Sequence, residues 1–570
     1  MIKIPYGKSN FKDLIEDNYF YQDRTSYIET LENYGSTYLV HLRPRRFGKS
    51  LFLSMLRHYY GQQYKNDFNT IFGQTFISTH LTAEVNNYLI LDFDFSGINT
   101  ATIETTYAGF LRNTLIGIGT FLTDYNTYFT KQQIKDILQE KEAHLAISML
   151  FSTWQNNQID KKIYILIDEY DHFANEIISF NFNDFSNIVS KNGFVRKFYE
   201  IIKTATRNGI VDRIFITGVS PITLDSMTSG FNIASNITLS SKFNNMLGFE
   251  EAEVRGILEK IDVPLDKITI VLDDLRDWYN GYLFSAETEN LPRLYNPNMV
   301  LYFAQKYQDI KGYPKDLLDA NIASDYTKIR KLFQIGGNEK GHIEALRELL
   351  KNGEIVSPLI TQFSFERNFA SEDLISLLFY MGFLTIKNER LGLYSFTFPN
   401  YVIKKLYSDY FLSFTREENA LPIDNRQLNE AIRTLATDGN PNPFFNEVML
   451  ILKSMSPRDA KNFNENTLKA IVVSLLHQQI FYYVHSEYPS KHFYMDIFLE
   501  TISGYKPKYE VAFEFKYLKK GESKALETKL LEASNQLEAY MKTPLFTGKT
   551  DVKAWAVVVL NSKIHAKMVR

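Results

Sequence analysis

The sequence predicts a multidomain α/β protein, and three observations lead to this prediction. The chain has 570 residues, several times the roughly 100–200 residues of a typical domain. Residues 1–245 alternate apolar, strand-like runs with helical patterns, and residues 246–425 are mainly helical. Residues 426–570 return to a mixture of helix and strand patterns. We therefore expect an α/β domain, a helical middle region and a second, smaller α/β domain.

Four runs of β-branched and aromatic residues predict the strands of the first domain. The runs are continuous rather than alternating, which is typical of strands buried on both faces of a parallel sheet between two layers of helices. They cover Thr37–Leu42, Tyr88–Asp94, Ile163–Glu169 and Arg213–Gly218.

The middle region contains one recognisable module. Residues Ser371–Tyr407 predict a helix, a β-hairpin and a second helix, an order that is winged-helix-like. The sequence leaves open whether this module contacts DNA or only packs on its neighbours.

The last domain has its own order of elements, which is helix, two or three strands, helix and strand. The expected helices are Glu465–Gln479 and Lys524–Lys542, and the expected strands are Phe493–Glu500, Tyr509–Leu518 and Trp555–Leu560.

Composition excludes several classes of protein. Lys and Arg number 63 against 66 Asp and Glu, so the net charge is −3 and the chain is not a globally basic nucleic-acid binder. The absence of cysteine excludes a disulfide framework, a Cys-ligated metal site and a thiolate nucleophile. No apolar run approaches the roughly 18–20 residues of a membrane span, and the N-terminus is too charged for a secretory signal. We therefore expect a soluble, cytoplasmic protein that does not enter a membrane.

A phosphate-binding loop is predicted after the first strand. The strand runs into RPRRFGKS, and Gly48, Lys49 and Ser50 open an apolar-periodic helix. In this layout, backbone N–H groups at the helix start bind phosphate oxygens, the Lys reaches the terminal phosphates and the Ser hydroxyl coordinates Mg²⁺. The candidate ATP contacts are Arg46, Phe47, Gly48, Lys49 and Ser50.

Two later strands end in polar residues that suit a nucleotide site. Asp168 and Glu169 follow an apolar strand, where Asp168 can hold Mg²⁺ and Glu169 can orient or deprotonate the attacking water. Thr217 ends another apolar strand and can sense the γ-phosphate, although a threonine at a strand end is more often structural. Arg43, Arg45 and Arg46 could contact phosphates, pair with acidic groups or lie solvated at the surface.

These motifs form an ordered set that resembles a known family. The set comprises YFYQDRTSYIETL, RPRRFGKSL, LIDEYD, FITGVSPI, LGFEEAEV, DWYNGYLF and LYNPNMVLYF. In this order, the motifs resemble those of the AAA-ATPase-like family that carries a C-terminal PD-(D/E)XK nuclease domain. The resemblance implies a P-loop ATPase in which Arg43 normally replaces the first glycine, Lys49 and Ser50 contact nucleotide and Mg²⁺, and Asp168 with Glu169 forms the Walker B pair.

The last domain contains a charged trio inside apolar strands. Asp496 lies in one strand, and Glu514 and Lys516 lie two apart, hence on one face, in the next. Unpaired buried charge is costly, so the trio suggests a function. Two carboxylates can bind Mg²⁺, or Mn²⁺, which polarises a phosphodiester, while the lysine positions a water and stabilises negative charge. This arrangement resembles the PD-(D/E)XK nuclease core.

Further residues extend the candidate nuclease site. The resemblance implies Glu487 as an additional metal ligand, and Gln536 with Tyr540 as the QxxxY element that supports the ligands. Gln536 and Tyr540 are four apart and share a helix face. Glu465 is another acidic candidate, with a solvated helix face as the alternative.

Two interpretations of the whole chain remain open at this stage. In the first, ATP binding and hydrolysis control a Mg²⁺-dependent nuclease that cleaves DNA, or RNA. Assembly of the chain into a homo-oligomer is compatible with this interpretation. In the second, the nuclease-like domain binds nucleic acid or protein without cutting, since Lys491 and His492 replace the usual glycine-rich turn. A lysine-rich groove for phosphates is a further hypothesis; its candidate residues are Lys506, Lys508, Lys519, Lys520, Lys524 and Lys529.

Overall fold

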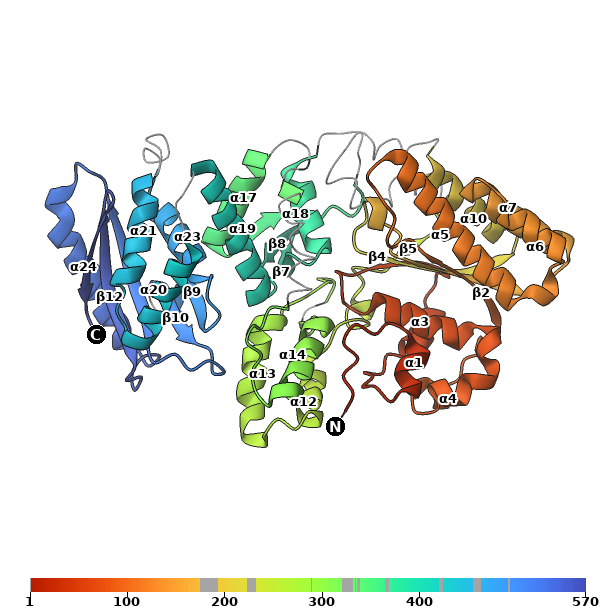
Figure 1. Ribbon diagram of the computed structural model, residues 1–570, viewed down its shortest axis with the longest axis horizontal. Helices are drawn as coiled ribbons and strands as arrows, with labels where there is room; N and C mark the ends of the chain where they lie inside the picture. Colours follow the sequence, from red (N-terminus) through yellow and green to blue (C-terminus); the bar gives the residue numbers. More distant parts are fainter. Residues whose placement is uncertain are drawn as a thin grey trace.

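The protein is an elongated chain of three parts that follow one another in space as in the sequence (Figure 1). The computed structural model describes residues 2–174, 193–222, 232–288, 290–319, 332–333, 335, 339–363, 369–419, 424–454, 463–490 and 493–570. The N-terminal part lies at one end, the C-terminal part at the other, and the helical region between them.

A five-stranded sheet forms the centre of the N-terminal part. Its strands are β1 (Tyr38–Leu42), β2 (Tyr88–Asp94), β3 (Lys162–Asp168), β4 (Val211–Gly218) and the short β5 (Ser235–Asn236). Their order across the sheet is β2-β3-β4-β1-β5, and all the neighbouring pairs are parallel. The four apolar runs are therefore confirmed as strands of a parallel sheet. Strand β5, with two residues, had no sequence signal.

Helices cover both faces of this sheet, as Figure 1 shows. One face packs against α1 (Phe11–Glu16), α2 (Tyr27–Glu32), α3 (Lys49–Tyr60) and α4 (Phe68–Phe72). The other packs against α5 (Ile103–Asp124), α6 (Lys131–Leu138), α7 (Ala143–Asn156) and α10 (Phe194–Arg207). Short 3₁₀ helices are η1 (Gln62–Asp67), η2 (Phe76–Thr79), η3 (Asn126–Tyr128) and η4 (Ser241–Phe243). Because both faces are covered, the central strands carry almost continuous apolar side chains.

The middle region combines helices with a small antiparallel sheet. Its first helices are α12 (Glu251–Lys260), α13 (Leu265–Tyr279) and α14 (Pro297–Ile310). They are followed by α17 (Glu339–Asn352), β6 (Glu354–Ser357), α18 (Ser371–Tyr380), β7 (Thr385–Arg390), β8 (Leu393–Thr397) and α19 (Tyr401–Asn419). The expected order of helix, hairpin and helix is present from α18 to α19, and β6 adds a third strand to the hairpin in the order β6-β8-β7. The winged-helix assignment itself stays a prediction.

The N-terminal part and the middle region share one hydrophobic core. A continuous cluster of buried side chains extends from Phe93 and Ile165 in the parallel sheet to Trp278 in α13 and Phe379 in α18. The division that we placed near residue 245 therefore separates two sequence patterns within one packed body.

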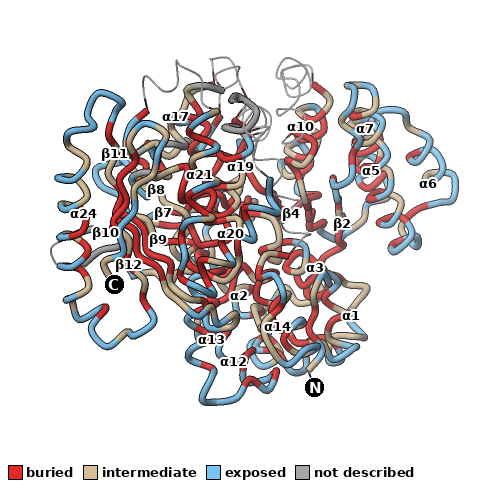
Figure 2. Tube along the Cα trace, turned by 60° about the vertical axis from the view of Figure 1, so that its left-hand side comes forward, coloured by how far each residue is buried: buried red, intermediate tan, exposed pale blue. Residues whose placement is uncertain are grey.

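The C-terminal part is a mixed sheet between two layers of helices. Its elements are α20 (Asn425–Asp438), α21 (Asn442–Ser454), α23 (Glu465–Leu476), β9 (Tyr482–Ser490), β10 (Phe493–Thr501), β11 (Glu510–Leu518), η6 (Ser523–Ala525), α24 (Leu526–Met541), β12 (Val552–Leu560) and β13 (Lys563–Met568). The strand order is β13-β12-β11-β10-β9, and β11 with β12 is the parallel pair. Figure 2 shows β10, β11 and β12 buried along much of their length. Among the described residues, no helix is long and apolar enough to span a bilayer.

Candidate functional site

The loop from Arg43 to Ser50 connects β1 with α3 at the carboxyl end of the parallel sheet. Two of its residues have left-handed backbones, Arg46 with φ +65° and Gly48 with φ +95°. Glycine adopts such a φ without steric cost, so Gly48 allows the chain to turn directly into the helix. The first N–H groups of α3 have no partner within the helix and are therefore available to an anion.

Lys49 is buried and lies across the inside of this loop. Its ammonium donates to the carbonyl oxygens of Arg43 and Pro44, at 3.1 Å each. The lysine thereby closes the loop on itself. Phosphate oxygens would be stronger acceptors for an ammonium than these neutral carbonyls.

Asp168 lies at the end of β3 and is bound by hydroxyl groups from two other segments. The Thr217 hydroxyl donates to Asp168 Oδ1 at 2.6 Å, and Ser50 is a second side-chain partner. Burial, followed by the charge of Glu169, raises the pKa of Asp168 despite these hydrogen bonds. Thr217 is itself fully buried. Its observed contact is thus with Asp168, whereas we expected it at the γ-phosphate.

Glu169 has a strained backbone and an ionised side chain. Its φ of +52° turns the chain sharply after β3, and such strain is often found at functional positions. Burial alone would raise its pKa, but the His172 imidazole and the charges of Lys49 and Arg45 outweigh burial and lower it to about 2. His172 Nδ1 lies 3.3 Å from Glu169 Oε2. The carboxylate is therefore available as a hydrogen-bond acceptor at neutral pH.

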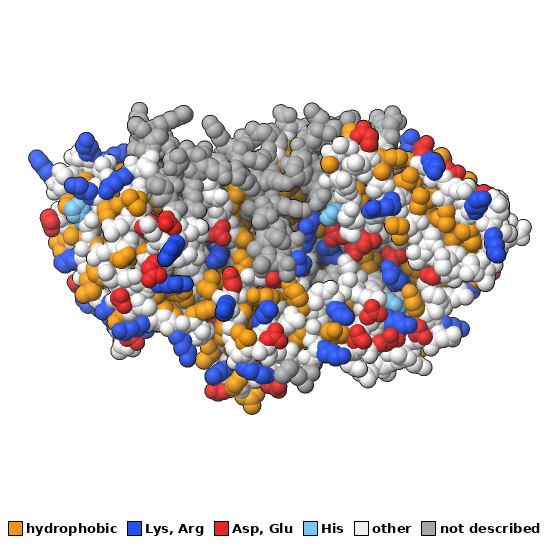
Figure 3. Space-filling view, in the orientation of Figure 1, with side chains coloured by type: hydrophobic (Ala, Val, Ile, Leu, Met, Phe, Trp, Pro, Cys, Tyr) orange, Lys and Arg blue, Asp and Glu red, His pale blue; other side chains and the backbone are white. Residues whose placement is uncertain are grey.

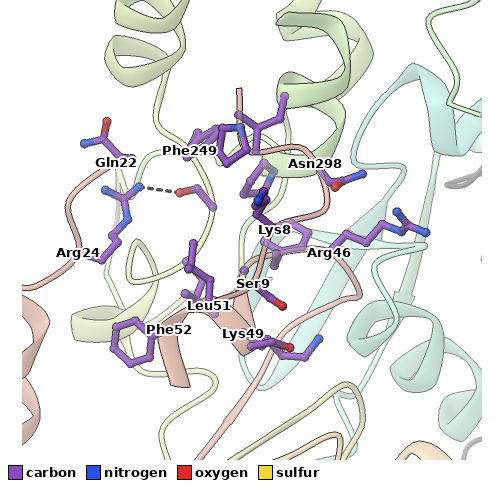
Figure 4. A pocket seen from close by; sticks show the side chains of 18 of the residues that line it. Lys8, Ser9, Gln22, Arg24, Arg46, Lys49, Leu51, Phe52, Phe249 and Asn298 are labelled. Atoms are coloured by element: carbon purple, nitrogen blue, oxygen red, sulfur yellow. Dashed lines mark hydrogen bonds between the residues drawn. The ribbon is translucent and has the colours of Figure 1, made fainter. Parts of the chain in front are cut away.

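A cavity of about 280 Å³ opens beside the loop (Figure 4). Its lining combines Lys49, Ser50 and Glu169 with residues that the sequence interpretation missed. The missed residues come from the N-terminal segment, from the 246–249 turn and from the start of α14, and include Lys8, Gln22, Arg24, Phe249 and Asn298.

Arg24 holds two of these segments together. Its guanidinium binds both carboxylate oxygens of Glu253 at 2.6 and 2.7 Å and the carbonyl oxygen of Gly248 at 2.7 Å. Apart from Lys8, the missed residues named above fall within the motifs YFYQDRTSYIETL, LGFEEAEV and LYNPNMVLYF. The motifs did not indicate that they form one wall, because Arg24 lies more than 200 residues from its partners and only the fold brings them together.

Arg43 has a structural role that differs from each of the three alternatives considered above. It is fully buried and donates to the carbonyl oxygens of Leu42, Thr238 and Phe243, each at 2.9 Å. Its guanidinium also lies 4.1 Å from the centre of the Phe284 ring. Arg43 therefore fastens the loop to the middle region.

Two further loop residues pack against the middle region. The Phe47 ring lies edge-on to Tyr282 and Phe284, with centroid distances of 5.0 and 5.4 Å. Pro44 approaches Gly382, where an added Cβ would lie 2.7 Å from the proline ring. The position of the loop thus depends on its packing against the segment that joins α18 to β7. Phe47, a candidate ATP contact in the sequence, also lines the cavity.

Asp496 and Glu514 face each other in the C-terminal sheet. The pairing of Ile497 with Phe513 places Asp496 on β10 directly opposite Glu514 on β11. Both carboxylates are buried. Asp496 Oδ2 accepts the N–H of Phe515 at 2.7 Å, and Glu514 Oε2 lies 3.4 Å from the Asp496 nitrogen.

The environment of the pair opposes two negative charges. Burial raises the pKa of Glu514 to about 7, and the charge of Asp496 acts in the same direction. Burial also raises the pKa of Asp496. Two carboxylates at such a site are stabilised in their ionised form by a nearby cation.

Two lysines supply positive charge at this point. Lys516 Nζ lies 3.0 Å from Glu514 Oε1, as the sequence pattern suggested. Lys469 of α23 lies 2.5 Å from Asp496 Oδ1 and 3.1 Å from Glu465 Oε1. Lys469 was missed by sequence reasoning. Its signal was the Glu-Lys spacing of four in ENTLK, which places both residues on one helix face.

The remaining candidate residues surround the same sheet position. The β9–β10 register sets the backbone of Glu487 opposite Asp496, while its side chain is outside the described residues. Tyr540 is buried on α24, and its pKa is raised by burial and by the charges of Glu514 and Asp496. Gln536 Oε1 is buried without a hydrogen-bond partner among the described residues. Lys491 and His492 lie outside the described residues.

Comparison with known proteins agrees with this division of the chain. Residues 5–228 match the family described as a predicted AAA-ATPase, and residues 463–568 match the PD-(D/E)XK nuclease superfamily. The chain carries an AAA-ATPase-like domain and a PD-(D/E)XK nuclease-superfamily domain. The chain is also 24% identical over 428 residues to an uncharacterized protein in the vnfD 5′ region of Azotobacter chroococcum mcd 1. This match covers 72% of the chain and 70% of that relative.

The donor set of the PD-(D/E)XK domain fits a divalent cation. Such domains generally use a divalent metal, and opposed carboxylates are the oxygen donors that Mg²⁺ prefers. Within the described residues, no group of three or more acidic or histidine side chains is arranged to hold a metal. Asp496 and Glu514 would therefore be the two described ligands.

The lysines proposed to line a groove do not form one group. Lys506 and Lys508 precede β11, whereas Lys519, Lys520 and Lys524 follow it. A nine-residue strand separates the two groups by roughly 25 Å. Lys529 pairs with Glu532 at 2.7 Å on α24. Only the second group follows the end of β11 that carries Lys516. Figure 3 shows basic and acidic side chains interspersed over the face in view.

The raised pKa of Glu514 predicts a pH-dependent stability of the PD-(D/E)XK domain. The folded state binds this proton more tightly than the unfolded chain, so the stabilisation is fully present below the unfolded pKa, near 4.5, and is lost as the pH rises through about 7. Between pH 4.5 and pH 7 the free energy required to unfold β10 and β11 should fall by about 1–3 kcal/mol, because the folded state loses the proton of Glu514, which titrates together with Asp496. Hydrogen exchange of the metal-free protein measures this quantity.

Glu514→Gln removes the titrating group and should remove most of that fall. Glu527→Gln, at an exposed position of α24, is the matched control and should retain it. An unchanged pH dependence in Glu514→Gln would contradict the assignment.

Proposed function

We propose that this protein binds and hydrolyses ATP in its AAA-ATPase-like domain and thereby controls a Mg²⁺-dependent nuclease in its PD-(D/E)XK domain. The observation that carries the proposal is the pair of opposed, buried carboxylates with two lysines inside a domain of the nuclease superfamily. DNA is the favoured substrate and RNA the alternative.

The proposed ATP site uses the Arg43–Ser50 loop. The N–H groups at the start of α3 would bind the phosphates, and Lys49 would exchange its two carbonyl partners for β- and γ-phosphate oxygens. Ser50 and Asp168, already hydrogen-bonded to each other, would hold Mg²⁺. Thr217 would orient Asp168. Glu169, ionised at neutral pH, would align the attacking water.

The proposed nuclease site uses Asp496, Glu514 and Glu487 as carboxylates around a divalent cation. A bound cation at such a site polarises the phosphodiester and lowers the pKa of a water. Lys516 would hold that water or the developing negative charge from beside Glu514. Gln536 and Tyr540 would support the carboxylates from α24, and the charges of Glu514 and Asp496 already act on Tyr540.

Packing through the middle region supports control of one site by the other, because Phe47, Tyr282 and Tyr401 belong to one buried cluster that also includes Tyr483 of β9. From Phe47 the contacts pass to Tyr282, next to Leu283, whose N–H donates to the Thr385 hydroxyl at 2.8 Å. At the start of α19, the Tyr401 hydroxyl donates to the carbonyl of Tyr482 at 3.0 Å and accepts the Val484 N–H at 3.1 Å. These last bonds lie on β9, the strand that carries Glu487. A winged-helix-like module would thus pack between the domains.

The ATP assignment predicts that Lys49→Ala weakens ATP binding by about 10–100-fold, because charge-assisted hydrogen bonds to phosphate are lost. Calorimetric titration with Mg²⁺–ATP measures the affinity. Lys65→Ala changes an exposed lysine of the same domain and should bind as the unaltered protein does. Full affinity in Lys49→Ala would rule out this role.

The nuclease assignment predicts Mg²⁺-dependent cleavage that Asp496→Asn reduces by at least about 100-fold, since one ligand of the cation is weakened. The assay offers linear, circular and single-stranded DNA and RNA, with and without Mg²⁺ and ATP. Asp551→Asn, at an exposed position before β12, is the control.

Cleavage that persists in both Asp496→Ala and Lys516→Ala would overturn the nuclease assignment. Nucleic-acid binding without cleavage under every condition would favour a nucleotide-dependent regulatory protein instead.

A further inference from the structure

Lys469 is paired with Oδ1 of Asp496, one of the two oxygens that a cation would use. The other oxygen, Oδ2, is engaged by the Phe515 N–H at 2.7 Å. Oδ1 is in contact with the Lys469 ammonium at 2.5 Å. The ammonium and a divalent cation repel each other, so a metal ion that binds Oδ1 competes with Lys469 for this oxygen.

The contact is buried enough to matter energetically. The exposed fractions are 8% for the Asp496 side chain and 19% for that of Lys469. Removal of a partner from a buried ion pair leaves an uncompensated charge, which is strongly unfavourable. Lys469 therefore satisfies Asp496 in the absence of metal, as Lys516 does for Glu514.

Glu465 gives the ammonium a second partner away from the site. It lies one helical turn before Lys469, at 3.1 Å from Nζ, and its side chain is more exposed, at 35%. The N-terminus of this helix is fixed by the Asn464 side chain, which accepts the Thr467 N–H at 3.0 Å. The lysine can thus leave Asp496 by a change of side-chain torsion alone and remain paired.

We propose that Lys469 is a resident competitor of the divalent cation, which binds Asp496 only when the ammonium moves onto Glu465. This inference rests on the proposed nuclease function and adds to it a residue that sets the metal affinity. After the exchange the cation lies beside Asp496, and Lys469 keeps Glu465 as its partner. It also makes the metal affinity of the site weaker than its carboxylates alone would provide.

The test is calorimetric titration of the full chain with Mn²⁺, in the absence of nucleotide. Heat that disappears in Asp496→Asn is assigned to this site. Lys469→Met should bind Mn²⁺ about tenfold more tightly than the unaltered protein, because the competing charge is gone. Lys469→Arg keeps the charge and should remain weak.

Lys529→Met, which breaks a surface ion pair of the same domain, is the matched control and should not change the affinity. Equal or weaker Mn²⁺ binding in Lys469→Met, with this variant folded as judged by its melting temperature, would overturn the inference and leave the nuclease proposal standing. Absence of Asp496-dependent Mn²⁺ binding in every variant would overturn both.

Discussion

The C-terminal domain is organised around two carboxylates that the register of β10 and β11 holds opposite each other inside a buried sheet. Such an arrangement is unfavourable unless cations lie beside it, and the surrounding elements supply them. Lys516 projects from β11 two residues after Glu514, and α23 is placed so that Lys469 reaches Asp496. The position of α23 on the sheet is therefore coupled to the charge state of the site. An entering divalent ion would have to displace these lysine side chains. Metal binding at the carboxylates would therefore affect how α23 packs on the sheet.

A second constraint operates at the other end of the molecule. The loop between β1 and α3 is held both by its own sheet and by the middle region, through the buried Arg43 and the ring of Phe47. The same loop continues into Lys49 and Ser50, and Ser50 is hydrogen-bonded to Asp168. A phosphate that draws Lys49 away from its carbonyl partners would alter the same loop that packs on Tyr282 and Phe284. Nucleotide binding at this loop would thus be linked to the position of the middle region through the shared hydrophobic core.

The sequence predicted most of what depends on local pattern. Continuous apolar runs predict the buried strands of the parallel sheet. In the C-terminal domain, Asp496, Glu514 and Lys516 are recognisable as charged residues within apolar runs. Strands β9 and β13 were missed because they are edge strands whose sequences, YYVHSEYPS and KIHAKM, are not apolar runs. Arg43 and Lys469 could not be assigned, because their partners come from distant segments. The sequence indicated that Thr217 is a polar residue at the end of a strand. It did not indicate the hydrogen bond to Asp168, because the two residues lie on different strands.

Anomalous scattering from a crystal of the full chain grown with Mn²⁺ tests the metal site most directly. We expect a peak between the carboxylates of Asp496 and Glu514, with the Lys469 ammonium moved from Asp496 toward Glu465. Lys469 still in contact with Asp496 Oδ1, with no anomalous peak beside the pair at saturating Mn²⁺, would contradict this expectation.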